Sequence, residues 1–221
     1  MANRPTRAAF INRAFHMLYH EAAWTYDAVA AAVSLGRWQA WGAAALPLLS
    51  GPRVLELGHG PGHMLARLAA HGYEAAGLDL SPQMGRMAAR RLVRAGVRPR
   101  LVRGRAQDLP FAPGAFDGAL AVFPTAYIVA PETITAVYRL LRPGGRLVVV
   151  PEAQLTGQGI IIRGIEWLNA ITGQRVDNSG PARDDFWRGR LGAVGFAVAI
   201  EDLDLGHSAV TVVIAQRPSV S

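Results

Sequence analysis

The chain has 221 residues, 51% of them hydrophobic, and this length suits one domain with a substantial core better than two independent domains. It contains no cysteine, which excludes disulfides, thiolate nucleophiles and cysteine-ligated metal sites, and we expect no bound metal ion. The net charge of +7 comes from 23 basic residues that are all arginine. Such a charge suits an anionic partner, but a uniform preference for arginine also fits GC-rich coding.

The first 49 residues form a predicted helical cap that belongs to the same domain. Apolar and aromatic residues recur there at helical intervals, from Phe10 to Val33. The basic opening of the chain lacks the continuous apolar core of a secretory signal, so we expect an amphipathic helix of a cytoplasmic protein. No apolar run of the chain approaches the roughly 18 residues of a membrane span.

From residue 52 onward, short apolar runs alternate with segments of helical length. The runs 53–58, 74–80, 98–104, 116–123 and 145–152 are predicted strands. Because helices separate them, they predict parallel βαβ units and a sheet with helices on both faces. The two apolar runs within 195–218 are separated only by "DLDLGHS", which is too short for a helical crossover, so we expect these strands to be antiparallel.

Two local signals mark helix ends between the predicted strands. Ser81 can cap a helix whose first residue is Pro82, just after the strand that ends in Asp79. The stretch "LLRPGG" predicts that a helix ends at Arg142, before the strand "RLVVV". Both signals place short loops at the ends of strands, where α/β folds bind ligands.

The stretch "VLELGHGPGHM" runs a predicted strand into a loop that contains Gly58, Gly60 and Gly62. This strand, glycine loop and helix indicate a cofactor site, because backbone N–H groups and a helix N-terminus meet there. The spacing differs from the dinucleotide pattern G-x-G-x-x-G, since His63 occupies the position of its third glycine. We interpret His59, within the loop, as a loop residue and not as a catalytic base.

Two carboxylates follow the next strands. Asp79 ends the second strand, where a carboxylate can accept hydrogen bonds from both hydroxyls of a ribose. Asp108 lies in "RAQDLPF" after the third strand, where it can accept from the exocyclic amine of an adenine. Taken singly, each carboxylate could also be an ordinary turn residue. The spacing of both carboxylates relative to the glycines favours a cofactor site.

With these motifs in order, residues 50–217 resemble the class I S-adenosylmethionine-dependent methyltransferases. The matching stretches are "ELGHGPG", "GLDLSPQM", "AQDLPF", "FDGALAVF" and "LLRPGG", and the similarity is strongest to quinone-biosynthesis and phospholipid N-methyltransferases. The resemblance implies a Rossmann-like, seven-stranded, mostly parallel sheet with an antiparallel C-terminal strand. Segment 155–194 would be a helical insertion that builds part of the substrate pocket.

The resemblance also assigns roles to residues around S-adenosyl-L-methionine, which would leave as S-adenosyl-L-homocysteine. The glycines would follow the methionine half of the cofactor, Glu56 would act behind the loop, and Asp79 would bind the ribose. The remaining residues implied to contact the cofactor are Asp108, Leu109, Leu80 and Met84 at the adenine, Phe123 at the methionine moiety and Tyr26 on the cap.

Methyl transfer from a sulfonium needs alignment and exclusion of water, and needs a base only if the acceptor must lose a proton. No catalytic residue can be assigned from the sequence, and the candidates for such a base are His16, Tyr19, His20 and Tyr127. The stretch "FPTAY" lacks the Asn or Asp followed by Pro-Pro and an aromatic residue that is frequent in enzymes that methylate nucleic-acid bases. Methylation of a nucleic-acid base therefore becomes less favoured.

The apolar stripe in 155–174 and the aromatic residues of the cap favour a small, hydrophobic acceptor: a quinone precursor, a phospholipid headgroup or a secondary metabolite. Together with the arginines, the stripe also suggests peripheral contact with an anionic membrane. RNA or protein methylation is the alternative within the same class. A non-catalytic cofactor-binding protein and a nicotinamide oxidoreductase are further alternatives.

Overall fold

The computed structural model describes residues 37–155 and 180–219. The chain divides into two compact units, Met1–Trp38 and Gln39–Ser221. The cap residues His16, Tyr19, His20 and Tyr26 and the apolar stripe of 156–174 lie outside the described residues.

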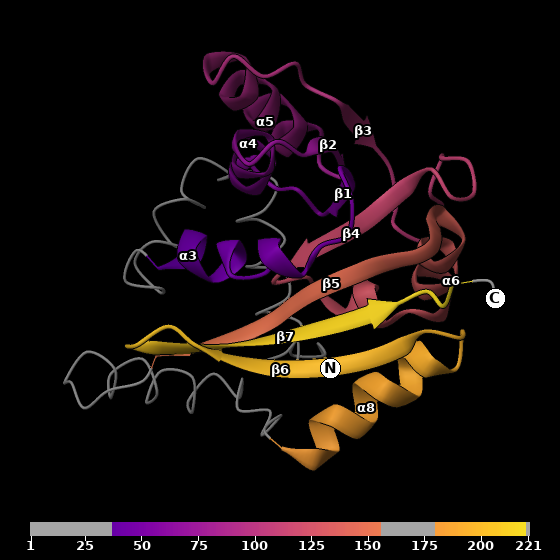
Figure 1. Cartoon of the computed structure of the whole chain (residues 1–221). Coiled ribbons are helices and arrows are strands. Elements are labelled where there is room, and N and C mark those ends of the chain that lie inside the picture. The colour runs from indigo at the N-terminus through magenta and orange to yellow at the C-terminus, as the bar shows by residue number, and fades with distance from the viewer. Residues whose placement is uncertain (1–36, 156–179, 220–221) are drawn as a thin grey trace, which may run out of the picture. The chain divides into compact units, whose positions relative to one another are not determined.

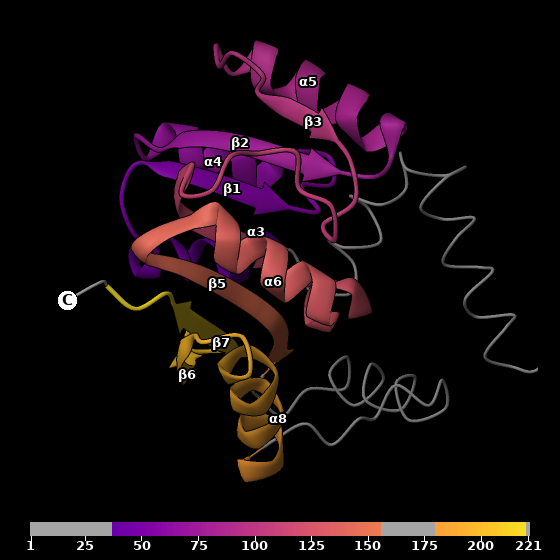
Figure 2. The same cartoon turned by 90° about the vertical axis from the view of Figure 1, so that its right-hand side faces the viewer.

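A seven-stranded sheet forms the centre of the second unit, with the strand order β3-β2-β1-β4-β5-β7-β6 (Figures 1 and 2). Strands β3, β2, β1, β4 and β5 are parallel, whereas β7 is antiparallel to both β5 and β6. This arrangement confirms the predicted mostly parallel sheet with an antiparallel C-terminal strand. The strands are β1 (Arg53–Leu57), β2 (Glu74–Asp79), β3 (Leu101–Arg103), β4 (Phe116–Val122), β5 (Leu141–Leu155), β6 (Ala197–Asp204) and β7 (Ser208–Gln216).

Helices cover both faces of the sheet and create two apolar cores. Residues of α6 and α8 pack with Leu55, Leu147 and Val213 on one face. Trp41 of α3 and Met64 of α4 pack on the other face. Because both faces are covered, the central strands of the sheet are continuous apolar runs in the sequence. The helices are α3 (Trp38–Ala43), η1 (Leu46–Leu48), α4 (His63–Ala70), α5 (Pro82–Arg94), η2 (Ala126–Val129), α6 (Pro131–Leu140) and α8 (Pro181–Gly192).

The local signals were right at α5 and wrong by two residues at α6. The Ser81 hydroxyl accepts a hydrogen bond from the Met84 N–H at 3.3 Å, and Pro82 is the first residue of α5. Helix α6 ends at Leu140 and not at Arg142, because Leu141 already pairs with Phe116 of β4. The next pair of partners is Gly118 of β4 with Arg146 of β5. The proline and the glycine pair that lie between Leu141 and Arg146 therefore form a bulge inside β5.

The N-terminal edge of the parallel strands is held by Asp117 of β4. Its carboxylate accepts from the Arg53 N–H at 2.9 Å and from the Arg53 guanidinium at 3.0 and 3.2 Å, and it forms an ion pair with Arg142 at 2.6 Å. Burial alone would raise the pKa of Asp117, but the hydrogen bonds and charges of the two arginines hold it below its ordinary value. This carboxylate therefore ties β1, β4 and the start of β5 together.

Candidate cofactor site

The glycine loop lies between β1 and α4, at the C-terminal edge of the sheet. Gly58, Gly60 and Gly62 all have positive φ angles, of 69°, 52° and 83°. A Cβ atom on Gly58 would come within 2.7 Å of the Tyr127 phenol oxygen, and one on Gly62 within 2.7 Å of Ala88. A Cβ on Gly60 would meet nothing within 4 Å, so Gly60 alone faces open space, where a ligand can approach the backbone.

Asp79 joins this loop to the end of β2. One carboxylate oxygen accepts from the Gly60 N–H at 2.9 Å, and the other accepts from the Ser81 N–H at 2.8 Å. The side chain is buried, and no arginine of the described residues is among its hydrogen-bond partners. The structure thus brings together two residues that the sequence assigned to one site, and each oxygen retains a lone pair for a further donor.

Glu56, the next-to-last residue of β1, carries a buried oxygen without a partner. The residue is 3% exposed, and its Oε2 has no hydrogen bond within the described residues. Burial raises the pKa of Glu56 well above its ordinary value, the charge of Asp79 raises it further, and the Leu65 N–H acts in the opposite direction. A buried acceptor without a donor is costly in a folded protein, so it marks a place where a ligand can supply the missing hydrogen bond.

His59 braces the loop from within. Its Nδ1 lies 2.7 Å from the Gly60 carbonyl oxygen, which can only accept, so the Nδ1 nitrogen carries the hydrogen. The ring packs on β2, where a Cβ on Gly77 would come within 2.8 Å of His59 Cδ2. Burial lowers the pKa of His59, although the charge of Asp79 and the Gly60 carbonyl act against it. The lowered pKa favours the neutral form of the ring.

The residues expected around an adenine differ in their access to solvent. Leu80 is 57% exposed directly after Asp79, and Asp108 is exposed as well. Leu109 is buried, and its carbonyl accepts from Arg139 at 3.0 Å. Met84 differs from the expectation, because it occupies the inward face of α5 and has no exposed surface, so its thioether offers nothing to a ligand in this conformation.

Two further candidates follow β4. Phe123 is the one residue other than glycine with a positive φ angle in the described ranges, and its ring meets Trp41 edge-on with centroids 6.0 Å apart. Tyr127 lies in η2, and its phenol donates a hydrogen bond to the Leu57 carbonyl at 3.0 Å. Tyr127 is thus the catalytic candidate that the structure describes, and its hydroxyl engages the backbone next to the glycine loop.

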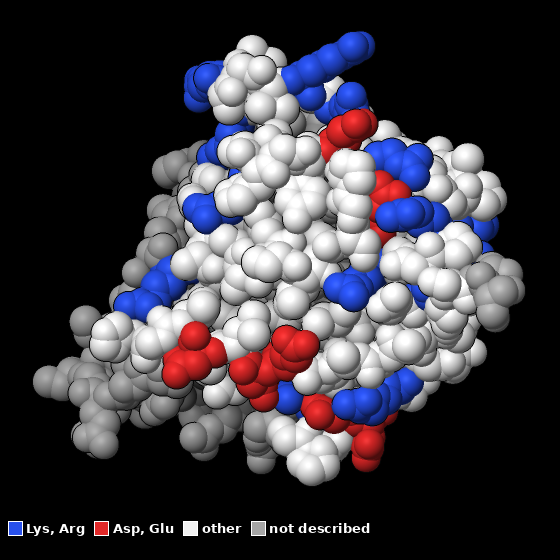
Figure 3. Space-filling view, viewed as in Figure 1, with Lys and Arg blue, Asp and Glu red and all other residues white. Residues whose placement is uncertain are grey.

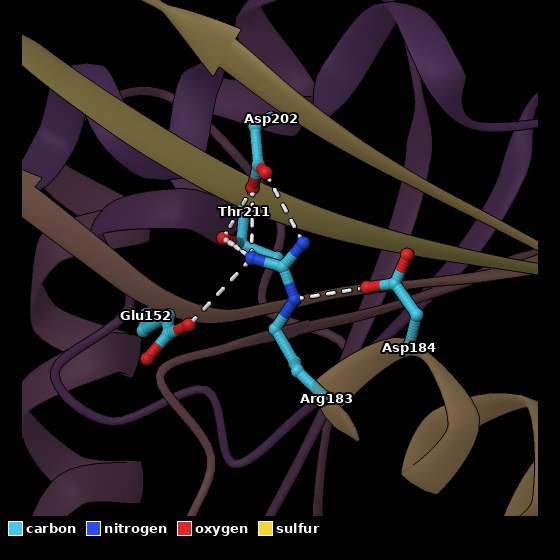
Figure 4. A network of polar contacts seen from close by, with 5 residues as sticks. All are labelled: Glu152, Arg183, Asp184, Asp202 and Thr211. Carbon is cyan, nitrogen blue, oxygen red and sulfur yellow. Dashed lines mark hydrogen bonds and ion pairs between the residues drawn. The ribbon is translucent and has the colours of Figure 1, made fainter. Parts of the chain in front are cut away.

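A second polar cluster lies where α8 meets β5, β6 and β7, and the sequence analysis missed it (Figure 4). Arg183 of α8 binds both oxygens of Asp202 at 3.0 and 3.1 Å, and it also contacts Thr211 and Asp184. Hydrogen bonds from Arg183 and Thr211 lower the pKa of Asp202, whereas burial raises that of Glu152. Four elements contribute to this cluster, and no motif of adjacent residues indicated it.

The described residues contain neither a cluster of metal ligands nor a helix that could span a membrane. No three His, Asp or Glu side chains gather there as a metal ion would require. None of the helices within 37–155 and 180–219 is both long and apolar enough to cross a bilayer.

The open sheet and its loops at the C-terminal edge define a Rossmann-like fold, and solved structures share it. The 4+2 cyclase SpnF has a TM-score of 0.59 and 19% identity, covering 83% of this chain and 82% of its own. Geranyl diphosphate C-methyltransferase from Streptomyces coelicolor has a TM-score of 0.57 and 18% identity, covering 81% and 78%. At this identity the likeness is one of fold.

The sequence comparisons identify the domain. Residues 54–145 match the family described as "Methyltransferase domain", which includes β1, the glycine loop and Asp79. This match confirms, for residues 54–145, the resemblance to S-adenosylmethionine-dependent methyltransferases that the motifs indicated.

Curated relatives support the same assignment. Demethylmenaquinone methyltransferase of Clavibacter sepedonicus is 33% identical over 136 residues, which is 60% of this chain and 55% of the relative. The enzyme of the same name from Thermus thermophilus is 33% identical over 139 residues, 60% and 63% of the two chains. The matched part of the chain thus spans between half and two thirds of the length of these relatives.

Proposed function

We propose that this protein transfers a methyl group from S-adenosyl-L-methionine to a small, hydrophobic acceptor in the cytoplasm. The observation that carries the proposal is the site formed by Gly60, Asp79 and Glu56. Gly60 leaves an open approach to the backbone of the loop after β1, Asp79 at the end of β2 has free lone pairs, and Glu56 near the end of β1 has a buried oxygen without a donor among the described residues. These features fit a ligand that has an ammonium group and ribose hydroxyls.

The bound cofactor would supply an activated methyl group on a sulfonium. The residues of this chain would bind and orient it. Gly60 leaves its backbone open to the methionine half, and Asp79 offers acceptors for the ribose. Leu80 offers an exposed apolar surface for the adenine. The resemblance implies that Asp108, in the stretch "AQDLPF", accepts from the exocyclic amine of that adenine.

The proposed acceptor is a quinone precursor, a phospholipid headgroup or a secondary metabolite. The relatives are named as demethylmenaquinone methyltransferases, which supports a quinone precursor as the acceptor. A solved structure of similar fold is that of a geranyl diphosphate C-methyltransferase. A base would be required only for an acceptor that loses a proton, and His16, Tyr19, His20 and Tyr127 remain the candidates. Alanine variants of His16 and His20 that bind cofactor but lose turnover would identify one.

The direct experiment incubates the protein with cofactor labelled in its methyl group and a panel of quinols and phospholipids. We expect label in an apolar acceptor and release of S-adenosyl-L-homocysteine. Calorimetric titration should give binding of S-adenosyl-L-methionine and none of NAD, which separates the proposal from an oxidoreductase. Binding without turnover on any acceptor would indicate instead a non-catalytic protein of the same fold.

A second candidate function comes from two similar proteins. The S-adenosyl-L-methionine-dependent Diels-Alderase iccD of Talaromyces variabilis is 28% identical over 181 residues, 76% of this chain and 60% of its own, and SpnF is a 4+2 cyclase. Such a reaction leaves the methyl group on the cofactor. A product formed from a polyene without release of S-adenosyl-L-homocysteine would favour cyclisation over methyl transfer.

Peripheral contact with an anionic membrane is a further part of the proposal, and α5 supports it. Arg86, Arg90 and Arg94 share one exposed face of this helix, and none of them forms an ion pair with another described residue. No acidic residue occurs from 80 to 107, and Val93 is 65% exposed. Figure 3 shows basic side chains over α5 and acidic ones along the opposite edge near β6.

The test of this contact compares two charge variants in vesicle flotation. Replacing Arg86, Arg90 and Arg94 with Gln should abolish salt-sensitive binding to phosphatidylglycerol vesicles. Replacing three arginines elsewhere, Arg67, Arg188 and Arg190, should leave it unchanged. Equal loss in both variants would mean that net charge and not α5 decides binding, and salt-dependent RNA retention that depends on α5 would favour RNA methylation.

A further inference from the structure

Tyr127 reaches from η2 to the strand that precedes the glycine loop. Its phenol donates to the Leu57 carbonyl at 3.0 Å, on the residue immediately before Gly58. The same oxygen occupies the space that a side chain at Gly58 would need, at 2.7 Å from the Cβ position. The phenol is therefore in contact with the first peptide of the loop in two ways.

The ring of Tyr127 is held in a fixed place. It packs against the apolar core that includes Ile128 and residues of α6. Backbone hydrogen bonds close the turn on both sides of it, from Ile128 to Thr125 at 3.2 Å and from Ala130 to Tyr127 at 3.2 Å. A ring anchored in this way can fix the group that its hydroxyl contacts.

The loop is held from the opposite side by β2. The Gly58 N–H donates to the Leu78 carbonyl at 2.7 Å, and the Gly60 N–H donates to Asp79. These contacts hold donors of the loop, whereas Tyr127 holds an acceptor, the Leu57 carbonyl, from the side of β4. The peptide between Leu57 and Gly58 is thus fixed between β2 and η2, and its orientation sets the direction of the loop that follows.

We propose that Tyr127 is a positioning residue, which holds the entrance of the glycine loop in the conformation that binds the cofactor. The proposal rests on the proposed function, because it assumes that this loop binds S-adenosyl-L-methionine. It gives Tyr127 a role other than that of the base considered from the sequence. A base would act on the acceptor during turnover, whereas a positioning residue acts on the cofactor site before the acceptor binds.

The variant Tyr127→Phe separates these two roles, because it keeps the ring and removes the hydroxyl. We expect the Kd for S-adenosyl-L-homocysteine, measured by calorimetry, to rise about fivefold, or about 1 kcal/mol, with kcat within about twofold. The matched control is Tyr138→Phe, since Tyr138 packs on Phe196 and Arg217, away from the loop. The control should keep the wild-type Kd.

Three other results would contradict either this proposal or the proposed function. An unchanged Kd in Tyr127→Phe overturns the proposal, and an unchanged Kd with kcat lowered a hundredfold or more would establish the base role instead. A wild-type protein that binds no S-adenosyl-L-homocysteine overturns the proposed function itself, which distinguishes that failure from the failure of this inference.

A double-mutant cycle tests the contact at Gly58 directly. Gly58→Ala places a methyl group 2.7 Å from the phenol oxygen, whereas without that oxygen the nearest ring atom is Cζ at 3.6 Å, an ordinary contact. The φ angle of 69° strains alanine in both backgrounds, so this cost cancels in the cycle. We expect Gly58→Ala to lower the melting temperature and weaken binding less in Tyr127→Phe than in wild type. Additive effects would overturn the proposal.

Discussion

Buried carboxylates at the two edges of the parallel sheet differ in their hydrogen-bond partners. At the N-terminal edge, Asp117 is surrounded by donors from Arg53 and Arg142. At the C-terminal edge, Glu56 has an oxygen with no partner in the described residues, and Asp79 accepts hydrogen bonds from the backbone N–H groups of Gly60 and Ser81. Burial raises the pKa at both Asp117 and Glu56, but the arginines reverse this at Asp117, whereas nothing reverses it at Glu56.

This difference separates a structural site from a binding site. A carboxylate whose lone pairs are filled by the protein contributes to stability, and it has little left for a ligand. A buried carboxylate with an unfilled lone pair lowers stability and can recover that cost when a ligand supplies the donor. The comparison therefore predicts that changes at the C-terminal edge alter cofactor binding and that changes at the N-terminal edge alter stability alone.

The largest effect is expected from Gly60→Val. Its side chain would project into the open space over the loop, and its φ angle of 52° strains any β-branched residue. We expect the Kd for S-adenosyl-L-methionine to rise more than about a hundredfold, because the valine takes the place of the ligand. Calorimetry measures this directly.

A matched control for that variant is Gly72→Val. Gly72 also has a positive φ angle, of 84°, and open space at its Cβ position, but it lies in the turn after α4. Both variants should lose about 1–2 kcal/mol of unfolding free energy from backbone strain. If Gly72→Val impairs binding as much as Gly60→Val does, strain and not blocked approach explains the loss.

A smaller loss is expected from Asp79→Asn. The amide keeps one acceptor for the two N–H groups of Gly60 and Ser81 and removes the charge that a ribose would contact. We expect binding to weaken by about ten- to a hundredfold, as for loss of a charge-assisted hydrogen bond together with a shift of the loop. The control is Asp204→Asn, an exposed carboxylate that accepts from the Gly206 N–H at 2.8 Å in the β6–β7 turn. Equal weakening in both would contradict a role for Asp79 at the cofactor.

The sequence predicted most of the sheet because its signals are local. Apolar runs gave the parallel strands, the short spacer gave the antiparallel pair, and Ser81 with Pro82 gave the start of α5. The end of α6 was missed by two residues, because the pairing of Leu141 with Phe116 of β4 decides it. A proline and two glycines look the same in a turn and in a bulge.

The sequence placed Gly60 and Asp79 close together, but it did not indicate the long-range partners of the residues around them. The spacing of the glycines and Asp79 was enough to place them together, as the bond to Gly60 shows. The contact of Tyr127 with Leu57 joins residues 70 apart in the chain, and the Arg183 cluster joins four elements. Burial of Met84 likewise depends on which face of α5 meets the core. Such contacts follow from packing, which no local pattern records.

Glu56→Gln should change how stability depends on pH. Because the pKa of Glu56 is raised in the folded state, the folded protein holds a proton that the unfolded chain releases above the ordinary value of 4.5. The stability of the wild type should therefore fall relative to the variant as the pH rises from this value, by at most about 1.4 kcal/mol per pH unit. Melting temperatures from pH 5 to pH 8 measure the difference.

Two further results sharpen that experiment. The exposed carboxylate of Glu132 on α6 provides the control Glu132→Gln, which removes a carboxylate from the surface and leaves the buried one in place. A parallel course of wild type and Glu56→Gln would contradict the interpretation of Glu56 as a buried acid with one oxygen that has no partner in the described residues. Saturating cofactor should stabilise the wild type more than Glu56→Gln if its ammonium supplies the missing donor.

Asp117→Asn should have the smallest effect on binding. The variant loses the ion pairs at the N-terminal edge, but Arg53 and Arg142 are 47% and 49% exposed, so water can solvate them. We expect a loss of about 1–3 kcal/mol of unfolding free energy at pH 7 with an unchanged Kd for the cofactor. Since the pKa of Asp117 is held below its ordinary value of 3.8, its contribution disappears as the pH falls, and the two proteins should become equally stable in acid. Weaker cofactor binding at pH 7 would show that the two edges are coupled, and the distinction between a structural and a binding carboxylate would then fail.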